Sequence, residues 1–401
     1  MDLKAATQKP PRHYPWDLLG SYANTIGVLW PCYGSGHVIY GLNTPKYRHR
    51  TVAKLSLERF DTTSTYYKAT PFVLDASVPL LHTFNVIPVN KDFIVSFELE
   101  LPRYLGAPTP AQLQRGMQWL DGPRCKKILA LSDFAHRYAR KRLEKNGSTR
   151  ALAKLAVFRG AVADPLGGKQ IAFAPRAPFS EKPFSAVVIG SELFRKGGMH
   201  AIRAFERLRE AGLDVRLTLI GRFETECYAL RECTPDADEW RARAASHDWI
   251  EMKASVPNAQ VFEELRAHDI CLYPSMDESL GWLTIEAGML GVPVVGNRIC
   301  AFTELIEHQR SGWLIDLPVD DDGRWAGITL RGDAHRNAVD LACDRIADGI
   351  VECVRHLYAA PHLLQEWGSR ARTLMRERYD ADAAASELER TYATALGPAG
   401  A

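Results

Sequence analysis

The sequence lacks the features of secreted and membrane-spanning proteins. Residues 1–12 contain no apolar stretch and no small-residue cleavage site, so they do not predict a secretory signal. The longest stretch without Asp, Glu, Lys or Arg, residues 18–45, is interrupted by Pro31, Gly34 and Gly36. A membrane-spanning helix needs about 20 predominantly apolar residues, and this stretch is too polar to supply them. We therefore expect a cytoplasmic protein.

Charge of one sign and paired cysteines are also missing. Fifty basic residues stand against 48 acidic residues, which leaves a net charge of +2. Because a protein that neutralises many phosphates needs a basic face, this near-balance argues against nucleic acid as the main partner. The eight cysteines form no C-x-x-C pair and have no histidine at zinc spacing. They predict reduced thiols, several of them packed in the core.

The composition is that of an ordinary globular protein, since 46% of the 401 residues are hydrophobic and 24% are charged. This length suggests two domains of Rossmann size. Residues 160–183 are rich in proline and glycine and predict the boundary. We expect a first domain over residues 1–165, a linker over 166–183, a second domain over 184–375 and a C-terminal helix and tail over 376–401.

The second half of the chain alternates short apolar runs with segments of helical periodicity. The apolar runs lie at residues 186–190, 215–221, 270–273, 292–296 and 313–316. The helical segments include residues 200–211, 261–268 and 282–290. Gly212 and Gly291 are expected helix stops, and a helical pattern over residues 337–395 is interrupted at Pro361. The fold class is therefore α/β, with parallel βαβ units in one doubly wound sheet that ends in a run of helices.

The first half shows a weaker pattern of the same kind. Strands are expected at residues 26–30, 79–82, 93–97 and 154–158. Ser132 is the expected N-cap of a helix over residues 133–145. Between Cys125 and Lys154 nine basic residues stand against two acidic ones. This basic helix is either a solvated face or a contact with an anionic membrane, which would place the protein at the inner face of that membrane.

The densest chemical signal is the segment over residues 274–295, PSMDESLGWLTIEAGMLGVPVV. Glu278 and Glu286 are eight residues apart across the expected start of a helix. At about 100° per residue, this spacing brings the two carboxylates to within roughly 80° of each other, so both can face one cleft. Free N–H groups near Gly281 favour phosphate or sugar oxygens. The alternative is a solvated amphipathic helix with acidic residues near its N-terminal end.

This segment resembles the E-x7-E signature of the retaining family 4 glycosyltransferases, which have the GT-B fold. Residues 189–198, IGSELFRKGG, resemble the donor-diphosphate loop of that family. In the family, this loop is followed by a helix and then by a strand that residues 215–221 resemble. Further parts of the family pattern match at residues 128–135, 311–315 and 367–392. The resemblance covers about residues 125–395 and is poor over the first 120. It implies two Rossmann-like doubly wound domains that face a cleft, with C-terminal helices.

The resemblance also implies roles on the donor side. Glu286 would bind the ribose hydroxyls of the donor nucleotide, and Glu278 would face the transferred sugar. Lys196, with Arg195 beside it, would neutralise the departing diphosphate, because fixed cations in a dry cleft stabilise a developing anion. The other implied donor contacts are Gly190, Ser191, Gly221, Ser279, Leu280 and Gly281. Without the resemblance, the Arg195-Lys196 pair is typical of a solvated surface turn.

Two positions depart from the family pattern. Ser191 stands where the family usually has an arginine, and Arg195 is the candidate replacement for that charge. Glu98 follows the strand expected at residues 93–97, where the family often has a histidine. Glu98 and Glu100 either contact sugar hydroxyls or begin a polar loop, since a carboxylate at the carboxyl end of a strand is a common site position.

The remaining candidates are on the acceptor side. His82, at the end of another expected strand, either lines the acceptor cleft or is structural. Gly34 and Gly36 lie in a glycine-rich turn where the family often places donor or acceptor contacts, although the G-x-G-x-x-G spacing of a dinucleotide site is absent. Asp320 and Asp322 imitate a metal-binding D-x-D motif, but their Pro/Gly/Asp context predicts a solvated loop and no metal site.

The resemblance implies transfer of a sugar from a nucleotide-sugar co-substrate to an acceptor hydroxyl, with retention of anomeric configuration and without a metal or cofactor. The expected acceptor is a saccharide or a lipid-linked saccharide, as in surface polysaccharide or glycolipid assembly. By analogy, the leaving phosphate helps to deprotonate the acceptor. Ser191 and Glu98 motivate an alternative, a non-catalytic nucleotide-sugar-binding subunit of a glycosylation complex. A sugar-nucleotide epimerase on a similar fold is a further alternative.

Overall fold

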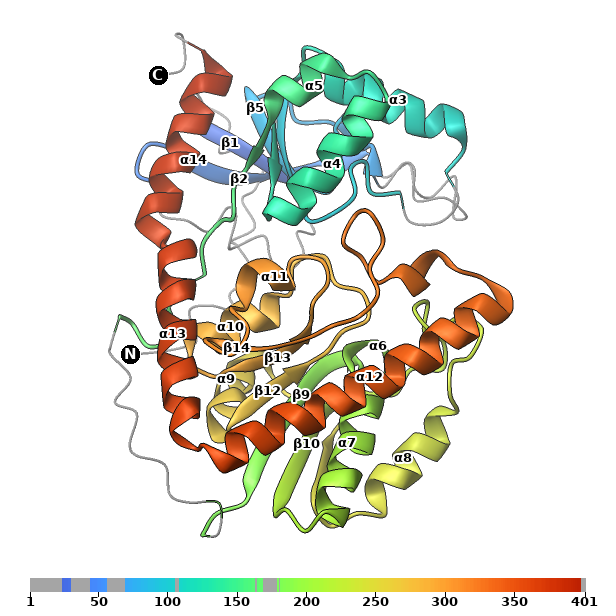
Figure 1. Cartoon of the computed structure of the whole chain (residues 1–401). Helices are drawn as coiled ribbons and strands as arrows, with labels where there is room; N and C mark the ends of the chain where they lie inside the picture. Colours follow the sequence, from blue (N-terminus) through green and yellow to red (C-terminus); the bar gives the residue numbers. More distant parts are fainter. Residues whose placement is uncertain are drawn as a thin grey trace. The chain divides into compact units, whose positions relative to one another are not determined.

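The computed structural model describes residues 24–29, 44–55, 69–104, 108–162, 164–168, 179 and 181–397. The chain divides into two compact units (Figure 1). The first comprises Met1–Val162 together with Tyr379–Ala401, and the second comprises Ala163–Arg378. The chain therefore leaves the first unit and returns to it for its last helix. Among the described helices, none combines the length and apolar character that a membrane crossing requires.

The second unit is built on one parallel sheet. Its strands are β9 (Phe184–Glu192), β10 (Val215–Arg222), β11 (Ile250–Lys253), β12 (Ile270–Tyr273), β13 (Val294–Asn297) and β14 (Gly312–Ile315). Their order is β11-β10-β9-β12-β13-β14, and every pairing is parallel. The chain runs outward from β9 in one direction and from β12 in the other, so the topological switch lies between these two strands. In such sheets, ligands bind at the carboxyl ends of the strands beside the switch.

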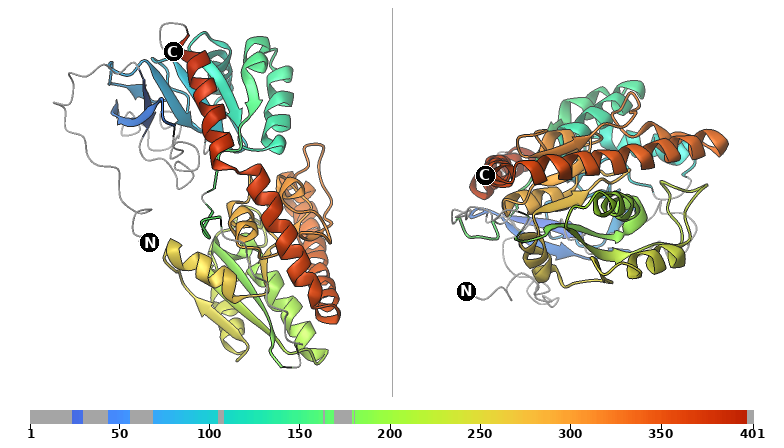
Figure 2. Two further views of the ribbon diagram at one scale, coloured as in Figure 1. Left: turned by 90° about the vertical axis from the view of Figure 1, so that its left-hand side faces the viewer. Right: turned by 60° about the horizontal axis from the view of Figure 1, so that its bottom comes forward.

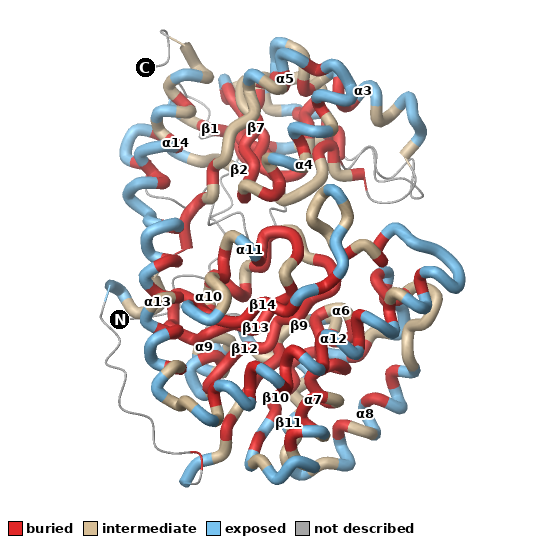
Figure 3. The backbone as a smooth tube through the Cα atoms, viewed as in Figure 1, coloured by how far each residue is buried: buried red, intermediate tan, exposed pale blue. Residues whose placement is uncertain are grey.

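Helices follow these strands and cover the sheet. They are α6 (Leu193–Lys196), α7 (Gly198–Glu210), α8 (Ala237–Ala245), α9 (Asn258–Ala267), α10 (Trp282–Met289), α11 (Phe302–Leu305), the 3-10 helix η3 (Ala326–Thr329), α12 (Gly332–Ala359) and α13 (His362–Arg378). The predicted alternation of strands and helices in a doubly wound sheet is confirmed, and the strands are largely buried (Figure 3). Gly212 and Gly291 adopt positive φ angles of 82° and 70° directly after α7 and α10, which ends these helices as predicted.

The first unit contains a second parallel sheet of the same design. Its strands are β1 (Thr25–Leu29), β2 (Arg48–Val52), β5 (Leu80–Phe84), β6 (Phe93–Phe97), β7 (Cys125–Ala130) and β8 (Leu155–Val157), in the order β2-β1-β5-β6-β7-β8. Two short strands, β3 (Lys54–Leu55) and β4 (Phe72–Val73), pair separately and antiparallel. The described helices are α3 (Pro110–Asp121), α4 (Asp133–Lys145), α5 (Thr149–Lys154) and α14 (Ala381–Leu396). The topological switch of this sheet lies between β1 and β5.

Two helices of the first unit show how the sequence fixes their positions. α4 begins where the sequence predicted, because Ser132 Oγ accepts a hydrogen bond from the Ala135 amide at 3.0 Å. α14 packs against the sheet, where the Tyr392 hydroxyl is hydrogen-bonded to Nε2 of His49 at 2.7 Å and to Nδ1 of His82 at 2.8 Å (Figure 2). The last helix of the chain is thus part of the core of the first unit.

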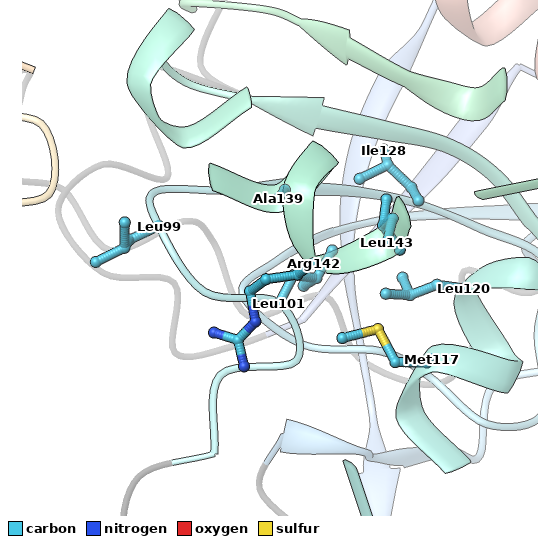
Figure 4. A pocket seen from close by; sticks show the side chains of 8 residues that line it. All are labelled: Leu99, Leu101, Met117, Leu120, Ile128, Ala139, Arg142 and Leu143. Carbon is cyan, nitrogen blue, oxygen red and sulfur yellow. The ribbon is translucent and has the colours of Figure 1, made fainter. Parts of the chain in front are cut away.

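A small apolar cavity lies in the first unit beside α3 and α4 (Figure 4). Its volume is about 10 Å³, which is room for about one water molecule. Such a cavity cannot hold a sugar or an acyl chain. It is lined by Leu99, Leu101, Met117, Leu120, Ile128, Ala139, Arg142 and Leu143.

Candidate active site

Two loops meet at the topological switch of the second sheet, one after β9 and the other after β12. The Met276 amide donates to the Arg195 carbonyl oxygen at 3.1 Å, which joins the two loops. Gly197 has a φ of 99°, and a Cβ at this position would clash with the Pro274 ring. Only glycine permits this close approach in this backbone conformation. The residues that resembled two separate family motifs are therefore brought together.

Lys196, Glu278 and Tyr273 form a buried cluster at this edge of the sheet. Lys196 Nζ forms an ion pair with Glu278 Oε2 and donates to the Tyr273 hydroxyl at 2.5 Å. The Tyr273 hydroxyl donates to the same carboxylate oxygen at 2.6 Å. Burial opposes ionisation of Glu278, but Lys196 and Tyr273 outweigh it and hold the pKa of Glu278 below its ordinary value. Burial also lowers the pKa of Lys196, and the charge of Glu278 offsets this only in part.

Arg195 connects the two loops through several partners. Its Nε donates to Glu192 Oε2 at 2.8 Å, and its Nη1 donates to the carbonyl oxygen of Asp277 at 2.9 Å. Nη1 also lies 3.8 Å from Glu278 Oε2. The charge of Arg195 is therefore paired in the free protein. Ser191 stands where the family pattern has an arginine. If Arg195 replaces that charge, it must exchange one of these partners for the diphosphate.

Asp277 is held from the other side by residues that are distant in sequence. Arg324 Nη2 donates to Asp277 Oδ1 at 3.0 Å, and the Tyr228 hydroxyl donates to Oδ2 at 2.9 Å. Arg324 belongs to the insert that we expected to be a solvated loop. Asp320 Oδ1 accepts from the Asp322 amide at 3.0 Å and the Arg324 amide at 2.9 Å, so it shapes a turn. The insert thus forms a turn, as expected for Asp320 and Asp322, and it also carries Arg324, which supports the site and which the sequence reasoning did not single out.

Glu286 and the residues before α10 present polar groups without protein partners. Within the described part of the chain, no donor lies within hydrogen-bond distance of the Glu286 carboxylate, and burial raises its pKa to about 7. The amides of Ser279, Leu280 and Gly281 likewise have no acceptor among the described residues. A half-buried carboxylate and a set of open amides on one segment are suited to a ligand that carries both hydroxyls and an anion.

The remaining donor-side candidates lie at the carboxyl ends of β9 and β10. Ser191 is exposed near the end of β9. Gly221 has a φ of 147°, and a Cβ there would clash with the Gly190 carbonyl oxygen. A Cβ on Gly190 would clash in turn with the Lys196 side chain. The two glycines therefore allow Lys196 to lie directly against the sheet.

The carboxylates predicted in the first unit are engaged by nearby cations. The Glu98 carboxylate is 3.3 Å from Arg103 Nη1, and its backbone amide donates to Asn85 Oδ1 at 3.2 Å. The Glu100 carboxylate is 3.2 Å from Arg142 Nη1. Glu98 and Glu100 lie after β6, one strand away from the switch between β1 and β5.

His82 is fully buried, and both of its ring nitrogens are hydrogen-bonded. Nδ1 is 2.8 Å from the Tyr392 hydroxyl, and Nε2 is 2.8 Å from Ser96 Oγ. Burial holds the pKa of His82 well below its ordinary value, so the ring is neutral. The geometry favours the structural alternative for this histidine. Gly34 and Gly36 lie outside the described residues.

Sequence reasoning missed several residues of this cluster. Tyr273 is the last residue of an expected strand, directly before the Pro-Ser turn, and that position is a signal that could have identified it. Asp277 lies within the 274–295 segment but was not singled out, and Tyr228 and Arg324 carried no local pattern. Within the described residues no group of three His, Cys, Asp or Glu side chains is arranged to hold a metal ion.

Comparisons with known proteins agree with the geometry. Residues 184–328 match the family model described as "Glycosyl transferases group 1", and this region contains both loops of the site. The chain is 31% identical over 114 residues to D-inositol 3-phosphate glycosyltransferase of Pseudarthrobacter chlorophenolicus, covering 28% of this chain and 26% of that protein. It is 31% identical over 143 residues to the amylovoran biosynthesis glycosyltransferase AmsK of Erwinia amylovora, covering 34% and 33% respectively. The matches thus span about a third or less of these relatives' length.

Two solved structures share the fold over nearly the whole chain. A glycosyltransferase from Rickettsia africae has a TM-score of 0.60 at 13% identity and covers 93% of this chain and 99% of its own. Anabaena Alr3699/HepE, solved in complex with UDP and glucose, has a TM-score of 0.58 at 11% identity and covers 92% and 99%. The predicted GT-B architecture is confirmed by these structures, and the match of residues 184–328 to the group 1 glycosyl transferases agrees with the predicted resemblance to the retaining family 4 enzymes.

Proposed function

We propose that the protein transfers a sugar from a nucleotide-sugar donor to an acceptor hydroxyl with retention of anomeric configuration. The observation that carries this proposal is the segment around the start of α10. There, the unpartnered Glu286 carboxylate and the open amides of Leu280 and Gly281 lie on one segment, next to the Lys196–Glu278 pair. Besides its base, a nucleotide sugar presents ribose hydroxyls, a diphosphate and a sugar, and each of these three has a candidate partner at this edge.

The nucleotide would be held by Glu286. Its carboxylate has lost water by burial and has gained no donor from the described residues, so it is poorly stabilised in the free protein. Two ribose hydroxyls would supply the missing donors, and a hydrogen bond to a charged acceptor contributes about 1.5–3 kcal/mol. Nucleotide binding would therefore also favour the ionised form of Glu286.

The diphosphate would be held by Lys196 and the open amides. In the free protein the Lys196 ammonium is paired with Glu278, so the diphosphate has to share or replace that partner. The amides before α10 need no such exchange, because no described residue accepts from them. As the glycosyl–phosphate bond breaks, negative charge grows on the leaving group, and these fixed donors stabilise it. The leaving phosphate would then accept the proton of the acceptor hydroxyl.

The names of related proteins support a proposal for the donor and acceptor classes. A structural neighbour was solved with UDP and with UDP-glucose, which makes uridine nucleotides the first donors to test. One relative is named for amylovoran biosynthesis and another for the glycosylation of D-inositol 3-phosphate. We propose a saccharide or lipid-linked saccharide acceptor in surface polysaccharide or glycolipid assembly.

A donor panel tests this function. Thermal unfolding with nucleoside diphosphates and nucleotide sugars identifies the donor, since a ligand at about 100 times its Kd stabilises by roughly 2.7 kcal/mol. Incubation with that donor should then release nucleoside diphosphate, slowly alone and faster with an acceptor, and the product should keep the donor's anomeric configuration. Binding without turnover would instead indicate the non-catalytic subunit. Conversion of the donor sugar without nucleotide release would indicate an epimerase.

We also propose that α4 contacts an anionic membrane at the cytoplasmic face. Exposed cations such as Arg137 and Lys145 lie along this helix, and each basic residue near an anionic surface contributes up to about 1 kcal/mol. Sedimentation with phosphatidylglycerol vesicles should pull down the protein, and the Arg137→Ala/Lys145→Ala variant should bind less. Replacing Arg216 and Arg266, exposed cations of the second unit, is the matched control. Equal binding to neutral phosphatidylcholine would overturn the proposal.

A further inference from the structure

Tyr273 is the one described residue that is hydrogen-bonded to both Lys196 and Glu278. It is the last residue of β12, and its side chain is almost completely buried. Its hydroxyl accepts from Lys196 Nζ at 2.5 Å and donates to Glu278 Oε2 at 2.6 Å. The Lys196 ammonium also lies 4.6 Å from the centroid of the Tyr273 ring, which is a cation–π distance.

The position of the Tyr273 ring is itself fixed. Phe302 of α11 packs against it edge to face, with ring centroids 5.5 Å apart and an interplanar angle of 84°. β12 pairs with strands on both sides, so the backbone that carries Tyr273 is held as well. The hydroxyl is therefore a pre-positioned group on a rigid ring, whereas the Lys196 ammonium is carried by a long side chain with four rotatable bonds.

We propose that Tyr273 is a positioning residue that keeps the Glu278 carboxylate in place when Lys196 turns to the donor diphosphate. In the free protein, Glu278 has two close partners, Lys196 and Tyr273. If the ammonium moves toward the diphosphate, the carboxylate loses its strongest partner while its surroundings stay buried. A buried charge without a partner is strongly disfavoured, and the carboxylate would rotate away from the position that faces the transferred sugar. The Tyr273 hydroxyl is the partner that does not have to move.

This inference rests on the proposed donor-side roles of Lys196 and Glu278. It adds that Lys196 binds the diphosphate while Tyr273 holds Glu278. The diphosphate competes with Glu278 for Lys196, and Tyr273 keeps the Glu278 carboxylate oriented toward the transferred sugar after that exchange. Removing the hydroxyl should therefore affect the complex in which a sugar is transferred more than the binding of the nucleotide. A purely structural tyrosine would alter stability and leave the balance between turnover and donor affinity unchanged.

The test is Tyr273→Phe, which keeps the ring, the contact with Phe302 and the cation–π face but removes the hydroxyl. We expect kcat to fall about 10- to 100-fold, the range for losing a hydrogen bond to a charged group, while the affinity for the bare nucleoside diphosphate stays near that of the wild type. Tyr358→Phe is the matched control. Tyr358 lies in the same unit and stacks on Phe179 away from the site, so its variant should keep the wild-type kcat.

A double-mutant cycle with Glu278→Gln shows whether Tyr273 acts through Glu278. We expect non-additive losses, such that Tyr273→Phe costs much less kcat once the carboxylate is gone. If Tyr273→Phe does not fold, 3-fluorotyrosine at position 273 keeps the ring and the hydroxyl and should change kcat without a change in nucleotide affinity. Additive losses, or wild-type kcat in Tyr273→Phe, would overturn the inference.

The failure of this inference is distinguishable from failure of the proposed function. If wild-type protein transfers or hydrolyses the donor and the Lys196 and Glu278 variants are impaired, but Tyr273→Phe is not, only the role of Tyr273 is wrong. If the wild-type protein releases no nucleotide from any donor, the proposed function is wrong and the role of Tyr273 falls with it.

Discussion

The carboxyl edges of the two sheets use charged side chains in different ways. In the second unit, Lys196 and Glu278 meet although they are 82 residues apart in the chain. In the first unit, Glu98 pairs with Arg103 only five residues later, on a loop that is partly exposed. An ion pair between neighbouring residues on an exposed loop requires little desolvation and contributes little to the folding stability. A buried long-range pair is costly to assemble, and such clusters are concentrated at functional sites. The comparison therefore supports the proposed location of the donor chemistry at the edge of the second sheet.

The largest effect should come from Lys196→Ala. Removing the cation that would face the diphosphate should lower turnover about 30- to 1,000-fold, which corresponds to roughly 2–4 kcal/mol of transition-state stabilisation. The variant should stay folded, because Tyr273 still binds Glu278. Steady-state kinetics beside thermal unfolding measure both properties, with Lys182→Ala as the exposed-lysine control. Near-wild-type turnover would show that this edge does not hold the leaving group.

The two glutamates should separate binding from turnover. Glu286→Ala should raise the donor KM and lower the affinity for the bare nucleoside diphosphate about tenfold or more. The reason is that the contact of Glu286 with the ribose is present in donor and product alike. Glu278→Ala should instead lower kcat and leave the affinity for the bare nucleotide close to wild type. Calorimetry with the nucleoside diphosphate, run beside kinetics on both variants, measures the split. The opposite pattern would mean that the roles are reversed.

His82→Ala tests whether the buried polar contacts of the first sheet are structural, in contrast to those of the second sheet. The substitution removes two buried hydrogen bonds and leaves a cavity, so the protein should lose about 2–4 kcal/mol of stability. Activity per folded molecule should stay unchanged. Denaturant unfolding and acceptor kinetics measure these outcomes, with the partly exposed His136→Ala as the control. An increased acceptor KM without a loss of stability would restore the acceptor role of His82.

The pH dependence of stability should report on Glu286. Its pKa rises from an ordinary 4.5 to about 7 on folding, so its contribution to stability is fully present below about 4.5 and is lost as the pH rises through about 7. Glu286→Gln removes this loss and should stabilise the ligand-free protein by about 1–3 kcal/mol at pH 8, with little effect at pH 4.5. Thermal unfolding at both pH values checks this, with the exposed Glu210→Gln as the control. An equal shift at both pH values would contradict it.

The smallest expected effect is that of metal removal. Lys196 and Arg195 supply positive charge where a metal ion would otherwise neutralise the diphosphate, so turnover in EDTA should equal the untreated rate. The measurement is donor turnover before and after chelation. Activity that disappears with EDTA and returns with magnesium or manganese would disprove metal independence and weaken the contrast between the two edges.

Contiguous patterns explain what could be predicted from the sequence. Buried central strands such as β12 and β6 are predominantly apolar, and the segment around Glu278 and Glu286 is a single stretch with a fixed spacing. The sequence patterns missed β2, with residues RHRTV, and β11, with residues IEMK. Both are edge strands with exposed charged side chains, so they lack the apolar signal on which the prediction depended.

The supporting contacts of the site could not be predicted because they exist only in three dimensions. Tyr228 and Arg324 reach Asp277 across 49 and 47 residues of chain, from segments that have no distinctive pattern of their own. Arg324 in particular belongs to an Asp- and Gly-rich insert whose composition is typical of a solvated turn.

The return of α14 to the first unit has a consequence for the synthesis of the protein on the ribosome. The second unit has all of its residues once Arg378 has emerged, whereas the first unit still lacks Tyr392, which follows His82 by 310 residues. The first unit, which is translated first, is therefore completed last. The face of its sheet that binds α14 stays uncovered while the entire second unit is translated. A nonsense mutation just before α14 would destabilise the first unit and leave the sheet of the second unit intact.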